Sequence, residues 1–103
     1  MGDPTRGKTL FLRMCVMCHT YNKDERHKIG PNLFGVVGRT CGTTSGFNYT
    51  EPMKKKGVVW DEKNLNEYLE FPRQFIPGTK MVFNGIKKAE DRQDIIAFLL
   101  TLK

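Results

Sequence analysis

Two cysteines and a histidine lie within five residues near the start of this chain, in the run Cys15-Val16-Met17-Cys18-His19. Thiols with two residues between them lie about one helical turn apart, so each can add to one of two neighbouring vinyl groups on a porphyrin edge. The imidazole that follows can reach the iron from one face of the ring with little further loop-closure cost. The run therefore predicts a covalently attached c-type haem, with His19 as an iron ligand.

Two other chemistries use the same residue types. The sulfur and nitrogen donors that a tetrahedral zinc site needs are offered by Cys15, Cys18, Cys41 and either His27 or His19. No second CxxC or HxxxH pair completes such a site. A zinc-binding structural or interaction module nevertheless stays an alternative interpretation of these residues. A dithiol redox centre is another, but the strand–CxxC–helix context of a thioredoxin-like site is not evident.

The length of the chain limits the size of its core. With 103 residues, 39% of them hydrophobic, the sequence predicts a single domain over residues 1–103, in which a buried cofactor would form much of the core. Burying the apolar surface of a porphyrin would contribute on the order of 10 kcal/mol, comparable to the whole net stability of such a domain. We therefore expect the cofactor-free chain to fold poorly.

The net charge of +6, with a pI near 9.4, favours an acidic partner, whether a protein, an anionic lipid or nucleic acid. Nucleic acid is the least supported of these, because no helix-turn-helix, zinc-finger, RRM or KH signature is present. The sequence thus favours a protein or lipid partner.

No apolar run approaches the roughly 20 residues that span a bilayer, and the first residues lack the charged and apolar regions of a cleaved signal. We therefore expect a soluble protein with no membrane span. Three cysteines are too few for a disulfide scaffold, and if haem takes two of them, Cys41 is left as an unpaired structural thiol.

Helical periodicity marks three stretches of the chain. A first helix is predicted to begin at Pro4, with Asp3 as its N-cap, and its apolar face continues to the cysteines. A second follows Asp61 and stops at Phe71-Pro72, and a third covers about residues 89–102. These are the three main helices.

Long loops are predicted between the helices. Residues 20–49 show no sustained period and are punctuated by glycines, and only a short helical turn is predicted between Thr50 and Gly57. So long an irregular stretch is unusual in a compact domain, unless a large ring supplies the surface that it packs against. No stretch alternates convincingly as a strand. The sequence therefore predicts an all-α fold, with three main helices, short helical turns and long loops wrapped around a covalently bound haem.

A second iron ligand is indicated by the run Pro77-Gly78-Thr79-Lys80-Met81, a tight turn that ends in a thioether. It lies about sixty residues beyond His19, a separation at which a loop can close over the far side of a porphyrin. Methionine is a soft, neutral ligand that favours ferrous iron and so raises the reduction potential.

Several motifs together closely resemble those of mitochondrial cytochrome c, a class I c-type cytochrome. The resemblance covers essentially the whole chain, and the motifs fall in the family's order and spacing. They are Cys15-Val16-Met17-Cys18-His19, Gly30-Pro31-Asn32-Leu33-Phe34-Gly35 with Gly38-Arg39, Trp60, and Pro77-Gly78-Thr79-Lys80-Met81 with Phe83.

The resemblance implies roles for individual residues around the haem. His19 and Met81 would be the axial pair, with the carbonyl of Pro31 accepting the outer imidazole proton. Tyr68 would stand near the Met81 sulfur and tune it, although an ordinary buried aromatic is the simpler interpretation of Tyr68 alone. The haem propionates would be surrounded by Arg39, Tyr49, Trp60 and Thr79.

The resemblance also implies a basic docking surface around an exposed haem edge. Its members here would be Lys8, Arg13, Lys28, Arg73, Lys80, Phe83, Lys87 and Lys88. Met14 and Gln74 replace basic residues usual in the family, so the surface is thinner here. Met53 replaces an asparagine that joins a buried water network, which removes polar anchors for ordered water.

The function implied is a one-electron carrier that cycles between ferric and ferrous haem c without transforming a substrate. Its expected partners are the acidic docking faces of a cytochrome bc1-type reductase and a cytochrome c oxidase-type terminal oxidase, with cardiolipin as an anionic lipid contact. A monomer in the mitochondrial intermembrane space is expected. Cell-death signalling and peroxidase activity after release of Met81 are secondary roles that the resemblance also suggests.

Overall fold

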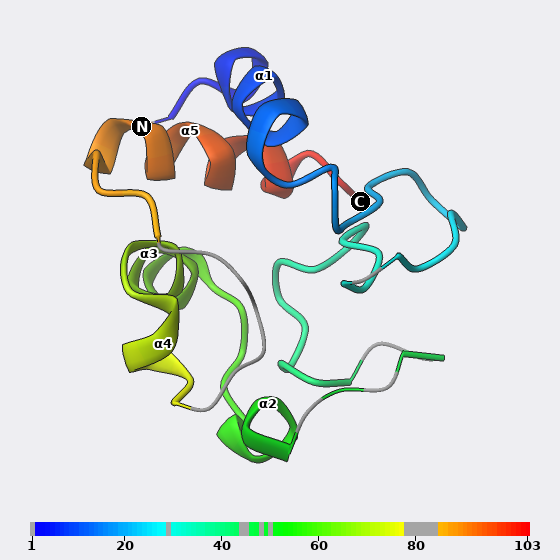
Figure 1. Ribbon diagram of the computed structural model, residues 1–103. Helices are drawn as coiled ribbons and strands as arrows, with labels where there is room; N and C mark the ends of the chain where they lie inside the picture. The colour runs from blue at the N-terminus through cyan, green and yellow to red at the C-terminus, as the bar shows by residue number, and fades with distance from the viewer. Residues whose placement is uncertain (1, 29, 44–45, 48, 50, 78–84) are drawn as a thin grey trace.

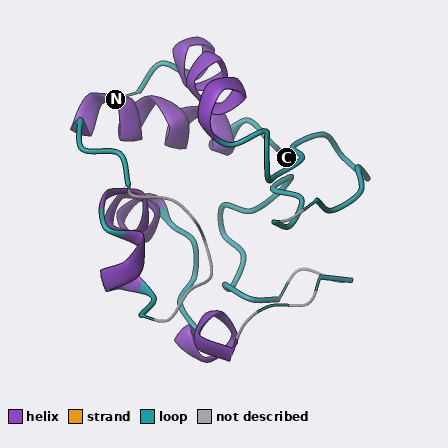
Figure 2. Cartoon of the chain, in the orientation of Figure 1, coloured by secondary structure: helices purple, strands orange, loops and turns teal. Residues whose placement is uncertain are grey.

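The computed structural model describes the chain except for residues 1, 29, 44–45, 48, 50 and 78–84. The described residues form helices joined by long loops (Figures 1 and 2). The helices are α1 (Pro4–Met14), α2 (Glu51–Lys56), α3 (Glu62–Glu70), α4 (Pro72–Phe75) and α5 (Ala89–Leu100). Extended pairing within the described part is limited to one isolated bridge between Thr40 and Val59. The predicted all-α fold is thus confirmed.

Capping explains where two of the main helices begin. The Asp3 carboxylate accepts hydrogen bonds from the backbone N–H groups of Thr5 and Arg6 at the start of α1, with Pro4 as the first helical residue. At the start of α3 the Asp61 carboxylate accepts a 2.7 Å hydrogen bond from the N–H of Asn64. Both N-caps are the ones that the sequence predicts.

The sequence analysis missed α4. Pro72 was expected only to stop the preceding helix, but it also occupies the first position of the next one. Proline is well suited to that position, because its fixed φ angle is helical and its missing N–H would have no partner in the first turn. Pro72 therefore both prevents α3 from continuing and begins α4.

The first helix and the last lie side by side (Figure 1). Phe11 of α1 packs against Phe98 of α5, with ring centroids 5.4 Å apart. A methyl group on Gly7 would overlap the backbone carbonyl of Asp94, so only glycine permits this close approach. The first and last helices are thereby packed closely together.

Asp94 is buried between these helices, with only 5% of its surface exposed. Its carboxylate accepts a 2.7 Å hydrogen bond from the backbone N–H of Asp3 and a 2.5 Å hydrogen bond from the guanidinium of Arg6. Arg6 also donates to Asp91 at 2.7 Å. A buried carboxylate is tolerated here because both of its oxygens have partners.

Replacing Asp94 with asparagine should remove part of the acid dependence of stability. The pKa of Asp94 lies below its ordinary value, because the N–H of Asp3 and then the guanidinium of Arg6 stabilise the charged form. Its stabilising contribution is therefore complete above the unfolded-state pKa of about 3.9 and is lost as the pH falls through the lower folded-state pKa.

We therefore expect Asp94→Asn to be clearly less stable than the parent protein at about pH 7, and the difference to narrow below about pH 4. Urea unfolding followed by circular dichroism across this range measures the effect. A stability difference that stays constant with pH would contradict it.

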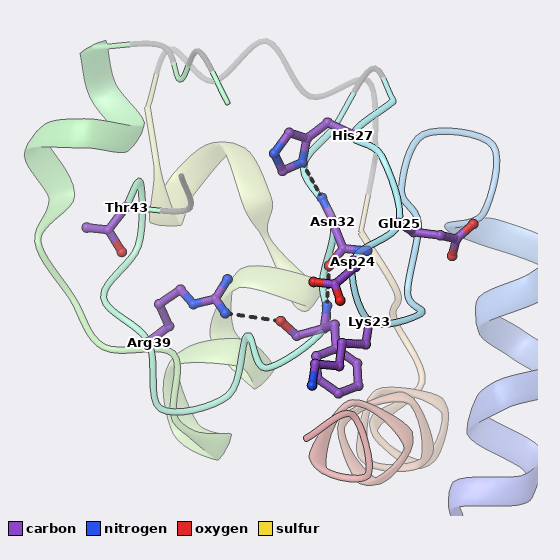
Figure 3. A pocket seen from close by; sticks show the side chains of 8 residues that line it. Lys23, Asp24, Glu25, His27, Asn32, Arg39 and Thr43 are labelled. Atoms are coloured by element: carbon purple, nitrogen blue, oxygen red, sulfur yellow. Dashed lines mark hydrogen bonds between the residues drawn. The ribbon is translucent and has the colours of Figure 1, made fainter. Parts of the chain in front are cut away.

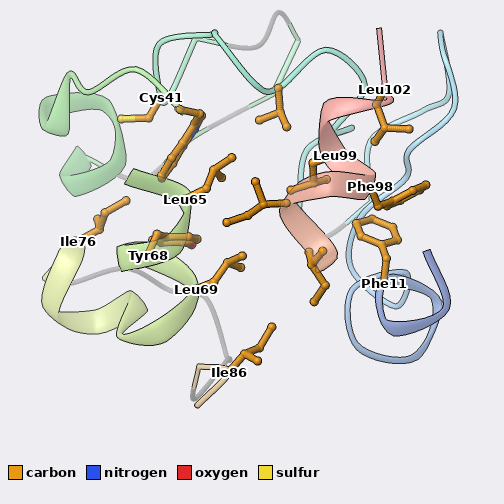
Figure 4. Close-up of a cluster of buried hydrophobic side chains, with 14 residues drawn as sticks. Phe11, Cys41, Leu65, Tyr68, Leu69, Ile76, Ile86, Phe98, Leu99 and Leu102 are labelled. Atoms are coloured by element: carbon orange, nitrogen blue, oxygen red, sulfur yellow. The ribbon is translucent and has the colours of Figure 1, made fainter. Parts of the chain in front are cut away.

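The apolar core lies between α3 and the α1–α5 pair (Figure 4). From α3, Leu65, Tyr68 and Leu69 are buried, and the C-terminal helix contributes residues such as Ile95 and Leu99. The described residues between positions 20 and 49 contain no helix, as the sequence predicts. No helix in the described ranges has the length and apolar character needed to cross a membrane.

Candidate functional site

The two cysteines of the CxxC run lie just beyond the end of α1. We expected the first helix to carry both of them, but it ends at Met14, and Cys15 is its C-cap. The chain then turns tightly, with the N–H groups of Cys18 and His19 donating to the carbonyl of Cys15 at 3.1 and 2.9 Å. This turn still keeps the two thiols about one turn apart, as attachment to a single ring requires.

The thiol of Cys15 is held in its neutral form. Burial, and to a smaller extent the neighbouring Cys18, raise its pKa to about 11. A redox-active dithiol depends instead on a lowered thiol pKa. The raised pKa of Cys15 therefore gives no support to a dithiol redox centre.

The ring of His19 is oriented by a backbone carbonyl. Its Nδ1 atom lies 2.8 Å from the oxygen of Pro31, and burial lowers the pKa of the imidazole against the smaller opposing effect of that hydrogen bond. The neutral ring thus donates from Nδ1 to Pro31 and keeps its lone pair on Nε2, the arrangement found in histidines that bind metals. The contact that the family resemblance implies is present.

Gly30 lies directly against the same ring. A methyl group on Gly30 would collide with three atoms of the His19 imidazole, and the N–H of Gly30 donates to the carbonyl of Cys18 at 2.7 Å. From the sequence, Gly30 is recognised only as part of a motif. Its physical role is to let the loop at residues 30–31 approach the imidazole closely.

The zinc alternative is not supported. The described residues contain no cluster of three or more His, Cys, Asp or Glu side chains that could hold a metal ion, and all four proposed zinc ligands lie among them. Cys41 is buried, with its Sγ donating to the carbonyl of Met53 at 3.3 Å. The Nδ1 atom of His27 accepts a 2.9 Å hydrogen bond from the N–H of Asn32. Both side chains are thus engaged in other contacts.

The donor set fits a haem c. One neutral imidazole with an oriented Nδ1–H can supply an axial ligand, and two thiols on one tight turn beside it can supply the thioether links. A porphyrin provides the other four ligands of its iron, so it needs no further cluster of protein donors. The residues present therefore fit a haem c better than a metal ion bound only by protein side chains.

Two of the four residues expected around the propionates are adjacent in the fold. The N–H of Trp60 donates to the carbonyl of Arg39 at 2.9 Å, and the N–H of Gly38 donates to the carbonyl of Trp60 at 2.8 Å. Tyr49 packs edge-on against Phe47, with centroids 4.8 Å apart. Thr79 lies outside the described residues. The roles of these residues toward the propionates stay predictions.

Tyr68 belongs to an aromatic cluster. Its ring lies 5.1 Å from that of Trp60 and 6.1 Å from that of Phe75, measured between centroids. Trp60 and Phe75 stack on each other at 5.9 Å. Tyr68 is expected to lie near the sulfur of Met81. Because Met81 lies outside the described residues, this role of Tyr68 also stays a prediction.

A polar cavity of about 520 Å³ has Arg39, one of the residues expected around the propionates, in its lining (Figure 3). It is lined by Lys23, Asp24, Glu25, His27, Asn32, Phe34, Arg39 and Thr43. Its lining includes neither the cysteine thiols nor His19, and its charged side chains have mixed signs. The cavity therefore does not reach the cysteines or the proposed histidine ligand.

All of the expected docking residues that the structure describes are exposed. Lys8 and Arg13 lie on α1, Arg73 lies on α4, and Lys87 and Lys88 precede α5. Lys80 and Phe83 lie outside the described residues.

Lys28, also exposed, is tied to the attachment segment. Its Nζ atom donates to the carbonyl of Val16 at 2.8 Å, so one positive charge is held beside the two cysteines. Met14 and Met17 add apolar surface there, with 38% and 78% of their areas exposed. The surroundings of the attachment site are thus partly basic and partly apolar.

Comparison with known proteins gives consistent matches along nearly the whole chain. The family model described as cytochrome c matches residues 4–103. Cytochrome c of Kluyveromyces lactis is 50% identical over 99 residues, which are 96% of this chain and 90% of that protein. The cytochromes c of Gibberella zeae and Stellaria longipes are each 51% identical over 98 residues, which are 95% of this chain and 92% and 91% of those proteins.

Proposed function

This chain belongs to the cytochrome c family and is an electron carrier with covalently attached haem c, and we propose that His19 and Met81 are the two axial ligands of its iron. The observation that carries the proposal is the orientation of His19, whose Nδ1 lies 2.8 Å from the Pro31 carbonyl. That contact leaves the Nε2 lone pair for coordination. When bound, the haem supplies a one-electron change between ferric and ferrous iron.

The chain's own residues attach and orient the group. Cys15 and Cys18 would hold the haem through two thioether links, each made by adding the S–H group of one cysteine across the double bond of one vinyl group. His19 would be one ligand of the iron, with Pro31 keeping its ring in the required tautomer. Met81 would fill the other position, so no coordination site stays open for a substrate.

We propose that Arg39, Tyr49, Trp60 and Thr79 surround the propionates and that Tyr68 lies near the Met81 sulfur. The backbone hydrogen bond between Trp60 and Arg39 supports the first assignment, because it makes these two residues neighbours in the fold. A cation and hydrogen-bond donors are what buried carboxylates need. The 5.1 Å contact between Tyr68 and Trp60 places the tyrosine in the same aromatic cluster.

The partners are respiratory electron-transfer proteins, as the family implies, and the relatives suggest a mitochondrial protein. We propose acidic faces on a bc1-type reductase and a terminal oxidase as the docking partners, and cardiolipin as a lipid contact. The net charge of +6 and the exposed basic residues of α1, α4 and positions 87–88 support this choice. A monomer of one domain, residues 1–103, in the intermembrane space completes the proposal.

Electron exchange with these partners should depend strongly on salt. Attraction between exposed charges is screened beyond about 10 Å at 0.1 M salt, so we expect the second-order rate with the oxidase to fall on the order of tenfold as ionic strength rises toward 0.2 M. Stopped-flow oxidation of the reduced protein measures this.

Charge reversal gives the matched comparison. Lys87→Glu should lower the rate and flatten its salt dependence, whereas Lys63→Glu makes the same charge change on the exposed side of α3, outside the proposed docking set, and should do so much less. Equal effects of the two variants, or a flat salt profile of the parent, would remove the docking proposal.

A further inference from the structure

Arg92 of α5 is a buried cation whose hydrogen bonds reach two other parts of the chain. Only 5% of its surface is exposed. Its Nε atom donates to the side chain of Asn66 in α3 at 2.8 Å, and its Nη1 atom donates to the carbonyls of Ile86 and Lys87 at 2.7 and 2.9 Å. The Glu70 carboxylate lies 3.7 Å from the same Nη1 atom. One guanidinium thus joins α3, α5 and residues 86–87.

The same short stretch is also attached to α3 through its backbone. The N–H of Ile86 donates to the carbonyl of Leu69 at 2.7 Å, which satisfies one of the carbonyls left open at a helix end. Gly85 has a φ of +97°, and a methyl group there would overlap the carbonyl of Glu70. Ile86 itself is only 6% exposed. Residues 85–87 are therefore fixed firmly against the last turn of α3.

A second fixed point precedes them in the sequence. Ile76 is 1% exposed, and its N–H donates to the carbonyl of Pro72 at 3.0 Å. Met81 lies midway in sequence between Ile76 and Ile86. Both ends of the segment that carries the proposed ligand are thus held by buried contacts.

We infer that Arg92 is a positioning residue for Met81, a role that rests on the axial pair proposed above. A buried cation is costly unless its donors are satisfied, and an apolar side chain would suffice merely to pack α5 on α3. The donors of Arg92 instead hold the downstream end of the Met81 segment. Losing them should raise the fraction of molecules in which the sulfur has left the iron.

The test compares Arg92 with Arg6, a second arginine whose hydrogen bonds involve α5. Arg92→Met removes the contacts to residues 86–87, whereas Arg6→Met removes ion pairs to Asp91 and Asp94 of the same helix and touches neither residue 86 nor 87. Both variants should lower the free energy of unfolding. Both are made as holoproteins and titrated with cyanide in the ferric state.

We expect Arg92→Met to bind cyanide about tenfold more tightly, because apparent affinity scales with the fraction of molecules whose iron is accessible. Arg6→Met should change that affinity less than about twofold. The sulfur-to-iron charge-transfer band should weaken only in Arg92→Met. Arg92→Lys, which keeps the charge and part of the donor set, should recover part of the parent behaviour.

Equal increases in cyanide affinity for Arg92→Met and Arg6→Met would show that Arg92 acts only through overall stability and would overturn the inference. Met81→Ala, titrated in parallel, separates the two proposals. If it fails to bind cyanide more tightly than the parent, the axial assignment is wrong. If it does and Arg92→Met does not, only the positioning role is wrong.

Asn66→Ala provides an independent variant, because it removes one acceptor and keeps the guanidinium. In the holoprotein it should speed hydrogen exchange at the amide of Ile86 more than at amides of the α1–α5 pair, and should raise cyanide affinity severalfold. Unchanged exchange at Ile86 would count against the positioning role of Arg92. This result is informative even if Arg92→Met does not fold.

Discussion

Met81→Ala should lower the reduction potential and open the iron to small ligands. The thioether is a soft donor that stabilises ferrous iron, so its loss shifts the balance toward the ferric state. We expect a decrease on the order of 0.1 V or more, a fraction of the roughly 0.8 V over which axial ligands move haem potentials. Spectroelectrochemical titration gives the potential, and cyanide titration of the ferric protein gives the accessibility.

Met14→Ala is the matched control for this experiment. It removes a thioether that is 38% exposed at the end of α1, and it should leave both the potential and the cyanide affinity close to those of the parent protein. If Met81→Ala had an unchanged potential and took up no cyanide, Met81 would not be the sixth ligand and another residue would have to be sought.

A chain that cannot attach haem should lose most of its helical structure. The double variant Cys15→Ala/Cys18→Ala removes both thioether links. The burial of porphyrin surface is worth on the order of 10 kcal/mol, as much as the entire net stability of a domain of this size. The largest loss of ordered structure is expected between residues 20 and 49, because the described residues there contain no helix.

Intact-mass spectrometry and far-UV circular dichroism of protein made under native conditions test this expectation. The double variant should show the bare peptide mass and a weak helical signal, whereas the parent should carry the added mass of one haem. Cys41→Ala removes a thiol that lies outside the motif, so it should keep the haem. A double variant as helical as the parent would show that the polypeptide core alone is sufficient.

The main helices could be predicted because their signals are local. Asp3 with Pro4, and Asp61, cap helices whose apolar positions recur at the helical period, and the structure has helices there. The second role of Pro72 was missed because the same residue that ends α3 begins α4. The end of α1 before the cysteines was also missed, since the tight turn at Cys15 preserves helical spacing without continuing the helix.

Buried charges could not be predicted in the same way. Asp94 and Arg92 lie on a helix whose sequence gives no indication that they are inside. Their burial depends on partners such as Arg6 and Asn66, which lie 88 and 26 residues away in the sequence. Pairing of this kind depends on tertiary contacts, which periodicity does not reveal.

Within the site, the attachment residues followed from spacing alone, but the orientation of His19 by Pro31 did not. Twelve residues separate the two, so only the family resemblance suggested the contact that the structure contains. The importance of Gly30 could have been inferred from its place directly before Pro31, in a loop that has to approach an imidazole closely. Thr79, Lys80, Met81 and Phe83 lie outside the described residues, and their roles rest on the sequence.

The hydrogen bond from Asp3 to Asp94 spans 91 residues of sequence, and so it makes the first and last helices one unit for folding. Closing so long a loop costs about 4 kcal/mol of chain entropy, which the helix pair has to offset before it gains any stability. Because the Asp94 carboxylate also accepts from the backbone of Asp3, removal of the residues around Asp3 should weaken the packing of α5 as well as the start of α1.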